Sequence, residues 1–474
     1  MHLVWFRQDL RIQDHSALFH AALADHTIAL AVLSPTQWKI HQDSAAKINL
    51  YLRQLNDLQQ QLNHQNIPLH CLIIETWDNI PKALAQFSEQ HAISDLHFNI
   101  EVGVNEHLRD QKVIEALTPL SIQIHQYHDR TLFPLGSIRN QSGQPYQVFS
   151  AFKKKCMEQL VIGQFSQPYP DIASQIKPDH FEQLNTPLDE MTWLDAQPSL
   201  HIEALWPSSE NYAQQQLNDF IDDRLYNYHL ERDLPNLNST SQISTYLNLG
   251  ILSIRQCLAA LFASSEHHVV LHNQGQETWL NELLWREFYL HLMYDHPALS
   301  KHLPFKRNTL NIPWRDANED LLAWQNGQTG IPIVDAGMRQ MLATGWMHNR
   351  VRMICAMFLS KNLLIDWRMG EAWFMQHLID GDLSANNGGW QWCASTGTDA
   401  VPYFRIFNPV SQSQKFDPEG EYIRRWVPEL QDLSARDIHD PYAKMPHRSL
   451  NYPRPIVDLK QSRLRAIETF KNYT

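Results

Sequence analysis

The sequence of 474 residues lacks several features that would assign it to common classes of protein. No apolar run approaches the roughly 20 residues that a membrane-spanning helix needs. The start, MHLVWFRQDLR, places Arg7, Asp9 and Arg11 where a secretion signal needs an uncharged stretch. The five cysteines are scattered and never spaced as C-x-x-C, which argues against a disulfide framework and a zinc site. We therefore expect a cytoplasmic protein with no membrane partner and no bound metal.

Positive charge is also scarce. The chain has 39 Lys and Arg against 51 Asp and Glu, so its formal net charge is −12 with histidine neutral. This balance excludes a uniformly basic nucleic-acid coat, and any nucleic acid must bind to a local positive surface. With 43% hydrophobic residues and only 16 glycines, the chain is neither disordered nor fibrous, and its length indicates about two to four domains.

The first 130 residues alternate short apolar runs with segments of helical periodicity. One such segment, residues 43–63, begins with Asp43-Ser44 as a cap signal. The apolar runs are residues 2–6, 27–34, 67–74, 95–100 and 121–127. Strands that alternate with helices predict an α/β domain with a parallel, Rossmann-like sheet. Neither G-x-G-x-x-G nor G-x-x-x-x-G-K-[ST] occurs, so this domain lacks the usual sequence signals for a dinucleotide or a nucleoside triphosphate.

The rest of the chain changes character twice. Residues 163–208 contain six prolines and little periodicity, which predicts a long connector over the surface. Residues 279–295 and 346–364 have strong helical patterns, so the second domain is predicted to be all-α. The expected domains are 1–130 (α/β), 131–209 (connector) and 210–474 (helical).

The segment WLNELLWREFYLHLMY (279–294) carries the first chemical pattern. On a helix, Glu282, Trp285, Arg286 and Tyr289 share about a third of the circumference. One interpretation is a surface salt bridge. The other is a base-recognition surface, in which an indole stacks on a planar ligand beside a carboxylate.

Two further segments combine polar and aromatic side chains. In GWMHNRVRMICAMF (345–358), Asn349 and Met353 share a helix face beside two arginines, although a core helix with surface arginines is an equally ordinary interpretation. In residues 366–409, IDGD is followed by Asn-Asn-Gly-Gly and by Trp390 and Trp392. No helix or strand propensity explains that string. Nine of the 15 tryptophans lie in residues 279–392, which fits either a packed core or a ligand site.

Together, WLNELLWREFY, TGWMHNRVRM and LIDGDLSANNGGWQW resemble the DNA photolyase and cryptochrome family. HLVWFRQDLR at the start resembles the opening of bacterial class I cyclobutane pyrimidine dimer photolyases. The resemblance covers essentially the whole chain. It implies an enzyme that binds FAD in its helical domain and uses the light-excited, reduced anionic flavin to split pyrimidine dimers in UV-damaged DNA. No protein partner is implied.

The resemblance also implies roles for particular residues. Asn386 matches the residue that faces flavin N5, where an amide suits the anionic ring better than a carboxylate. Glu282, Asn349 and Met353 would contact the flipped dimer, and Trp285 and Trp392 would form its apolar wall. The implied FAD contacts are Tyr228, Thr240, Ser241, Gln242, Ile243, Ser244, Arg286, Asp380, Gly381 and Asp382. The implied phosphate contacts to DNA are Arg232, Arg350, Arg352 and Arg405.

Two further elements of the family have counterparts. Trp390, Trp367 and Trp314 match a chain of three indoles that carries an electron to oxidised flavin. Asn105, Glu106 and Lys301 match a binding pattern for a folate antenna, 5,10-methenyltetrahydrofolate, although Ser300 stands where some relatives have cysteine.

Three alternative functions are considered. A cryptochrome-type photoreceptor shares the fold and flavin, but Asn386 keeps the photolyase amide and only a short segment follows Trp426. Repair of the (6-4) photoproduct uses histidines where Asn349 and Met353 stand. An ordinary flavin oxidoreductase lacks a nicotinamide-binding signal here and would turn over in darkness.

Overall fold

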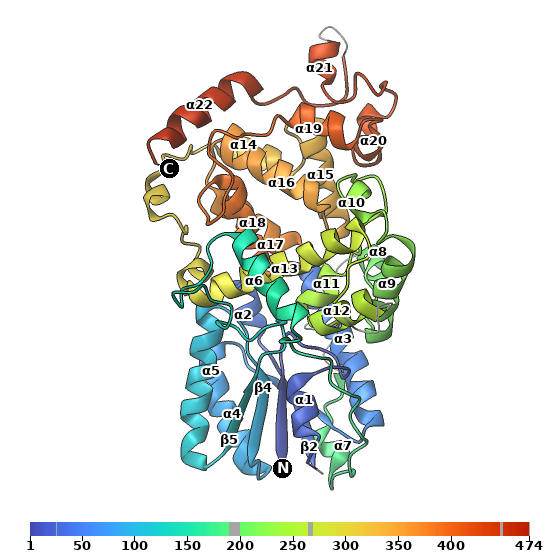
Figure 1. Cartoon of the computed structure of the whole chain (residues 1–474), viewed down its shortest axis with the longest axis vertical. Coiled ribbons are helices and arrows are strands. Elements are labelled where there is room, and N and C mark those ends of the chain that lie inside the picture. The colour runs from blue at the N-terminus through green and yellow to red at the C-terminus, as the bar shows by residue number, and fades with distance from the viewer. Residues whose placement is uncertain (25, 189–199, 264–268, 446–448, 474) are drawn as a thin grey trace. The chain divides into compact units, whose positions relative to one another are not determined.

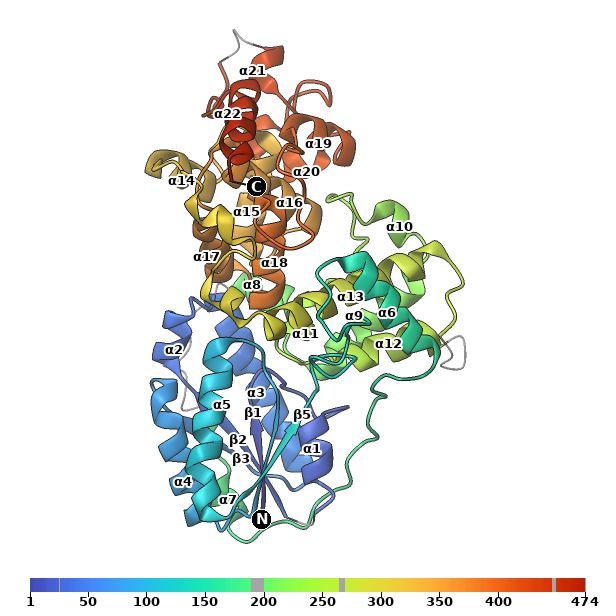
Figure 2. The same cartoon turned by 60° about the vertical axis from the view of Figure 1, so that its left-hand side comes forward.

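The computed structural model describes residues 1–24, 26–188, 200–263, 269–445 and 449–473. They form two compact units, drawn from two sides in Figures 1 and 2. Unit 1 comprises Met1–Arg224 and Ser241–Pro297, and unit 2 comprises Leu225–Thr240 and Ala298–Thr474. Among the described residues, no helix has both the length and the apolar character needed to span a bilayer.

A parallel sheet of five strands lies in unit 1, with the order β3-β2-β1-β4-β5. The strands are β1 (His2–Phe6), β2 (Thr27–Leu33), β3 (Leu69–Ile73), β4 (Asp95–Asn99) and β5 (Gln123–Tyr127). Each predicted apolar run contains one of them, so the α/β prediction is confirmed. Parallel strands need crossover helices on both faces, which explains why β1 and β2 are almost continuously apolar and buried.

Helices cover the two faces of this sheet. Helices α4 (Ile80–Gln90) and α5 (Val104–Leu117) pack together on one face, and α1 (Ser16–Ala21) lies on the other (Figure 1). The side chain of Ser44 accepts a hydrogen bond from the Lys47 amide and begins α3 (Ala45–His64), as the cap signal predicted. The connection from β2 also contains α2 (Pro35–Ile40).

Charged side chains from distant segments tie unit 1 together. Arg255 donates to Asp14 at 2.8 Å and to Asp129 at 2.7 Å, and Arg11 donates to Asp129 at 2.7 Å. All four side chains are at most 3% exposed. Burial alone would raise the pKa of Asp129, but the two guanidinium groups hold it well below its usual range. The network joins the start of the chain to residues beyond 250.

The remaining helices of unit 1 come from both sides of position 210. They are α6 (Phe149–Val161), α7 (Phe181–Leu184), α8 (Leu200–Leu205), α9 (Glu210–Asp223), α11 (Ser244–Asn248), α12 (Ile254–Phe262) and α13 (Gln274–Asp295). Helix α6 lies inside the predicted connector, 131–209, but ahead of its proline-rich part, residues 163–208. Part of the connector, 189–199, lies outside the described residues. The domain bounds themselves stay a prediction.

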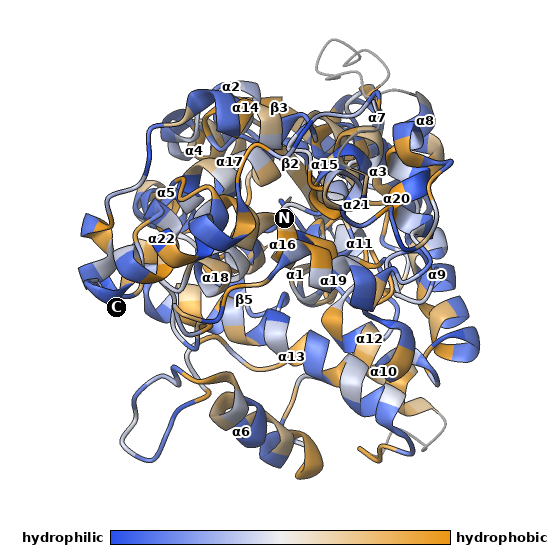
Figure 3. Cartoon of the chain, turned by 90° about the horizontal axis from the view of Figure 1, so that it is seen from above, coloured by the Kyte–Doolittle hydropathy of each residue, from blue (hydrophilic) through white to orange (hydrophobic). Residues whose placement is uncertain are grey.

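Unit 2 is helical, as predicted for this part of the chain. Its helices are α10 (Tyr228–Glu231), α14 (Asn318–Gln325), α15 (Pro332–Thr344), α16 (Asn349–Met357), α17 (Trp367–His377), α18 (Leu383–Ala394), α19 (Pro409–Phe416), α20 (Glu421–Trp426), α21 (Pro441–Lys444) and α22 (Leu459–Lys471). They enclose a core that includes Trp324, Trp367 and Trp390. Helices in both units carry both hydrophobic and hydrophilic residues (Figure 3).

Candidate functional site

A cavity of about 150 Å³ opens among α16, α17 and α18 of unit 2. Aliphatic and aromatic side chains line it together with a few polar groups, as in sites that bind planar ligands. Sequence analysis had singled out much of its wall. The predicted residues that line it are Asn349, Arg352, Met353, Asp380, Gly381, Asp382, Asn386 and Trp390.

The Asp-Gly-Asp sequence begins a helix at the edge of this cavity. Asp382 accepts a hydrogen bond from the Ala385 amide at 2.9 Å and so caps α18. The string that sequence analysis could not assign to a helix or a strand is therefore helical from Leu383 to Ala394. Gly389 lines the cavity, and a Cβ added there would meet nothing within 4 Å, so this part of the helix backbone faces open space.

Arg352 belongs to this cavity through an ion pair. It donates to both carboxylate oxygens of Asp380, at 3.0 and 2.9 Å, and through Nε to the Met347 carbonyl. The Nη2 contacts to Asp380 and the Nε bond to Met347 together fix the guanidinium plane against the wall. Arg352, which was predicted to contact DNA phosphates, is therefore already bonded to Asp380 and Met347.

Asn386 is held by the neighbouring helix. Its Nδ2 donates to the Glu371 carbonyl at 3.0 Å, and the amide of Asn387 donates to the Glu371 carboxylate at 2.8 Å. Glu371 is fully buried and also contacts His302 at 2.9 Å. These bonds fix the Asn386 carboxamide at the cavity wall, where it presents a neutral polar group to a ligand.

The lining of this cavity fits part of a flavin. Gly389 leaves room for a flat ring, Asn386 offers an amide, and Arg352 with Asp380 offers charged groups at the edge. The volume is below the roughly 300–1,000 Å³ of typical ligand sites, so this cavity accounts for one portion of FAD only.

The three predicted indoles of the electron chain differ in exposure. Trp390 and Trp367 are 2% and 1% exposed, and Trp314 is half-buried. Trp390 lies at the cavity wall, and Trp314 meets the ring of Phe470 edge-on with centroids 5.7 Å apart. Two of the indoles are therefore buried, and Trp314 is the one of the three that reaches solvent.

The predicted residues of α13 belong to unit 1. Trp285 stacks on Phe149 of α6, with ring centroids 3.7 Å apart and planes 9° apart, so one face of the indole is covered. Arg286 donates to the carbonyls of Arg130 and Leu247, at 2.7 and 3.5 Å. Glu282 is half-buried on the same helix. Sequence analysis gave no sign of the Phe149 stack, because nothing in the sequence links α6 to α13.

The other predicted FAD residues are divided between the units. Tyr228, which is buried, and Thr240 belong to unit 2. Ser241 to Ser244 belong to unit 1, where Gln242 has a positive φ of 53° and Ser244 begins α11. Trp392 lies on α18, half-buried against the core of unit 2.

The predicted DNA-binding arginines lie in unit 2 and differ in their partners. Arg350 is paired with Asp233 at 2.8 Å and lies over the ring of Phe416. Arg232 lies 3.9 Å from Asp233 and over the ring of Tyr228. Arg405 is exposed.

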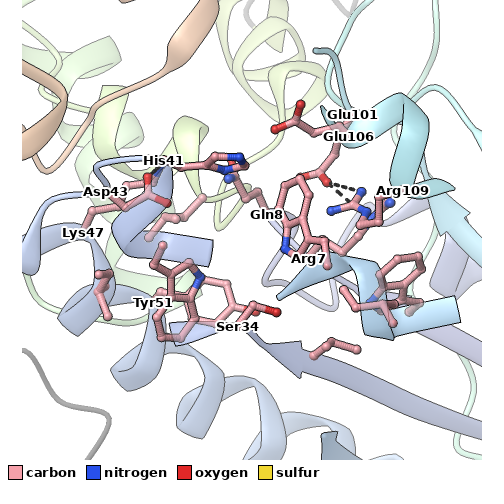
Figure 4. A pocket seen from close by; sticks show the side chains of 17 residues that line it. Arg7, Gln8, Ser34, His41, Asp43, Lys47, Tyr51, Glu101, Glu106 and Arg109 are labelled. Carbon is pink, nitrogen blue, oxygen red and sulfur yellow. Dashed lines mark hydrogen bonds and ion pairs between the residues drawn. The ribbon is translucent and has the colours of Figure 1, made fainter. Parts of the chain in front are cut away.

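Unit 1 contains a second cavity, beside the ends of β1 and β4 (Figure 4). Arg7 and Arg109 lie within 4 Å of the Glu101 carboxylate. Burial would raise the pKa of Glu101, but these arginines and Arg130 hold it at about 2. Glu106 lines the same cavity, and there burial and the nearby Glu101 raise its pKa to about 7.

Of the three predicted antenna residues, Glu106 lines this cavity. Asn105 and Glu106 lie in the first turn of α5, and the Asn105 amide is 3.0 Å from Nε2 of His41. Lys301 belongs to unit 2. The other lining residues come from separated segments, so no local pattern could have predicted this cavity.

One structural residue near the first cavity also escaped sequence analysis. A Cβ added at Gly370 of α17 would lie 2.1 Å from Cη2 of Trp390 and 2.6 Å from Cδ2 of Leu359. Only glycine allows α17 to approach this indole so closely. An isolated glycine in a helical pattern is a weak hint of such close packing.

Comparisons with known proteins match the whole chain. Residues 2–173 match the DNA photolyase family model, and residues 279–472 match the model of the FAD binding domain of DNA photolyase. Deoxyribodipyrimidine photo-lyases of Salmonella typhimurium and Escherichia coli are each 42% identical to the chain, covering 99% of it and 98% of their own length.

Solved structures agree over a similar extent. A class III photolyase from Agrobacterium tumefaciens superposes with a TM-score of 0.87 at 30% identity, covering 99% of this chain and 97% of that one. An archaeal photolyase from Sulfolobus tokodaii with two FAD molecules gives 0.85 at 28% identity and complete coverage of both chains. A Synechocystis cryptochrome gives 0.86 at 28% identity, with 99% coverage of both.

Proposed function

The chain belongs to the DNA photolyase family, and we propose that it repairs cyclobutane pyrimidine dimers in DNA in a reaction driven by light. The activity is that of a deoxyribodipyrimidine photo-lyase, a carbon-carbon lyase. The observation that carries this proposal is the 42% identity, over 99% of the chain, to relatives of that name. The cavity of unit 2 supports it, because its lining suits a flavin ring.

FAD is the cofactor, and we assign its contacts within this proposal. When bound, reduced anionic FAD excited by blue or near-ultraviolet light would supply one-electron chemistry, in which the dimer would receive an electron and return it after its ring opens. Asp380, Gly381, Asp382 and Arg286 hold the flavin. Tyr228 and residues 240–244 hold the phosphates and the ribityl chain.

Asn386 suits an anionic flavin for an electrostatic reason. A carboxylate at the same position would repel a negative ring, whereas an amide can donate or accept a hydrogen bond without a net charge. The bond from Asn386 to the Glu371 carbonyl holds the amide in place, so no side-chain freedom is lost when the cofactor binds.

The dimer is expected to leave the duplex before it reacts. Because the dimer already disturbs base stacking, flipping it costs less free energy than flipping normal bases. Glu282, Asn349 and Met353 would contact it, and Trp285 and Trp392 would form the apolar wall. The stack of Phe149 on Trp285 supports this role, because it fixes the plane of an indole on which a base can rest.

DNA binding needs local positive charge on a chain of net charge −12. We assign phosphate contacts to Arg232, Arg350, Arg352 and Arg405. The exposed Arg405 is expected to contribute most, since Arg350 and Arg352 already pair with carboxylates. We propose that the enzyme acts in the cytoplasm without an obligate protein partner.

The tryptophans Trp390, Trp367 and Trp314 are proposed as the electron path that reduces oxidised flavin. The partial exposure of Trp314 supports its place at the end of the path, because the last indole must exchange an electron with a reductant in solution.

For the antenna we propose 5,10-methenyltetrahydrofolate, held by Asn105, Glu106 and Lys301. The Sulfolobus tokodaii structure, with two FAD molecules, makes a second flavin the alternative. Mass spectrometry of the pigments released from purified protein separates the two. A folate that is lost in Glu106→Gln supports the proposal, and a second equivalent of flavin contradicts it.

Repair itself is tested with a thymine-dimer oligonucleotide and the reduced, FAD-loaded protein. Absorbance of intact thymine is expected to recover under blue light and not in darkness. Glu282→Gln is expected to slow repair about tenfold through the loss of one charge-assisted hydrogen bond. Glu277→Gln, an exposed site on the same helix, is the matched control and should repair normally.

Two other outcomes would favour a different function. Flavin photoreduction without dimer repair would favour a cryptochrome-type photoreceptor, which the Synechocystis match makes the second candidate. Repair of (6-4) photoproducts in place of cyclobutane dimers would contradict the roles given to Asn349 and Met353.

A further inference from the structure

We propose that unit 1 binds a divalent transition-metal ion, of the zinc class, through His2, Asp95 and His97. These residues lie on the sheet face that α1 covers, near the starts of β1 and β4, whereas the cavity of unit 1 lies beside the other ends of these strands. The sequence predicted no metal because its cysteines lack the spacing of zinc ligands. The three ligands proposed here come from two strands, and His2 and Asp95 are more than 90 residues apart in sequence, so no local pattern shows them.

The register of the sheet explains why these side chains meet. His2 of β1 pairs with Asp95 of β4, and His97 follows Asp95 by two residues. Laterally paired residues of parallel strands point to the same face, and so do residues two apart on one strand. The sheet therefore fixes three Cα positions with respect to one another before any ion binds.

The distances are those of a preformed site. Nδ1 of His2 lies 2.9 Å from Nε2 of His97, and Nε2 of His2 lies 3.5 Å from Oδ2 of Asp95. One ligand atom from each of the three residues lies within 4.8 Å of the other two. Two ligands of a tetrahedral zinc ion, at about 2.0–2.1 Å from it, are roughly 3.3 Å apart. Small side-chain rotations suffice to bring the three atoms to one ion.

Neighbouring groups orient the ligands. Nδ1 of His97 lies 2.9 Å from the Tyr127 hydroxyl, and Nε2 of His125 lies 2.8 Å from Oδ1 of Asp95. If the His97 Nδ1–H donates to Tyr127, the lone pair of Nε2 points at His2. Such outer hydrogen bonds set the tautomer and orientation of metal-binding histidines and carboxylates.

Chemistry and access favour this class of ion. Two imidazoles and one carboxylate suit zinc, nickel or copper, whereas magnesium and calcium prefer oxygen ligands alone. His97 is 3% exposed, but the His2 side chain is 27% exposed, so an ion can enter from solvent and keep a water as its fourth ligand.

The test is calorimetric titration of the FAD-loaded full chain, without a histidine tag, with zinc chloride. Wild type is expected to bind one tight equivalent. His2→Gln and His97→Gln should weaken that equivalent by more than about 100-fold, and His125→Gln, which removes an outer partner, by about tenfold. His64→Gln, an exposed histidine at the end of α3, is the matched control and should bind as wild type does.

Thermal unfolding gives a second readout. Zinc should raise the midpoint of wild type and of His64→Gln but not that of His2→Gln, because binding to the folded state alone stabilises it. His2 is partly exposed, so this variant decides the question even if His97→Gln fails to fold. Zinc bound equally well by wild type and His2→Gln, or no saturable equivalent in wild type, would overturn the proposal and leave a hydrogen-bonded histidine cluster.

Discussion

Two buried carboxylates, Asp129 of unit 1 and Asp335 of unit 2, are stabilised in opposite ways. In unit 1, Asp129 is surrounded by Arg11 and Arg255, which hold its pKa well below the usual range despite burial. In unit 2, burial raises the pKa of Asp335 to about 6, although the hydrogen bonds from Thr329 and Tyr452 oppose this. Asp129 is neutralised by opposite charges, and Asp335 is surrounded by neutral donors.

This difference follows the task of each unit. The ion pairs of unit 1 join residues 241 and 118 positions apart and so fix the chain path around the sheet. In unit 2, the Trp390 ring packs against Phe374 and Trp324, with centroids 5.0 and 6.0 Å apart. This aromatic surrounding of Trp390 is suited to an electron path.

Asp129→Asn should have the largest effect on stability. Removing this carboxylate leaves Arg11 and Arg255 buried with too little negative charge, at a cost of about 3–5 kcal/mol in the free energy of unfolding. Asp335→Asn should cost less, about 1–3 kcal/mol, because its partners are neutral donors. Urea unfolding measures both, with the exposed Asp171→Asn as the control. Equal costs would contradict the comparison between the units.

Gly370→Ala should have the next largest effect on stability. The new methyl group would overlap the Trp390 ring, so α17 must shift, and we expect a loss of about 1–3 kcal/mol and slower flavin photoreduction. Gly389→Ala is the informative companion. Its methyl group enters the open cavity, so it should lower FAD affinity while the stability of the FAD-free protein stays unchanged. A stability loss of the same size in both variants would show that the Trp390 packing is not special.

Trp314→Phe should leave stability nearly unchanged and slow light-driven reduction of oxidised FAD about tenfold or more, since a phenyl ring is much harder to oxidise than an indole. Trp426→Phe, another half-buried tryptophan of unit 2, is the matched control. Absorbance of the flavin under blue light with an external thiol measures both. Unchanged photoreduction in Trp314→Phe would remove this residue from the proposed path.

The sequence predicted elements that local patterns encode. The five strands, the Ser44 cap and the helical character of unit 2 all follow from periodicity and capping, which act over a few residues. Much of the lining of the unit 2 cavity was predicted because it comes from short sequence motifs: IDGD, the Asn-Asn-Gly-Gly string and the segment around Asn349.

What escaped prediction depends on contacts between distant segments. The Arg255 network joins residues 241 positions apart, and the stack of Phe149 on Trp285 joins helices that no pattern relates. The Asp382 cap shows a different failure. A polar, glycine-rich string has low helix propensity, but a good cap and tertiary packing make it helical.

The smallest expected effect concerns His302, which pairs with the buried Glu371 of unit 2. The hydrogen bond to Glu371 raises the pKa of His302, against burial and the nearby Arg368 and Lys301. The pair therefore stabilises the fold fully below pH 6.5, the value for the unfolded chain, and this contribution is lost as pH rises through the folded-state pKa. Because His302 is about half exposed, His302→Gln should cost at most about 1 kcal/mol more at pH 6 than at pH 9.

His377→Gln provides the opposite sign in the same unit. Burial lowers the pKa of His377, and the bond to the Trp373 carbonyl offsets this only in part. Wild type then loses stability as pH falls below 6.5, so replacing His377 should cost less at pH 6 than at pH 9. Urea midpoints of both variants across this range measure the two slopes. Slopes of the same sign would mean that the ion pair with Glu371 does not set the protonation of His302.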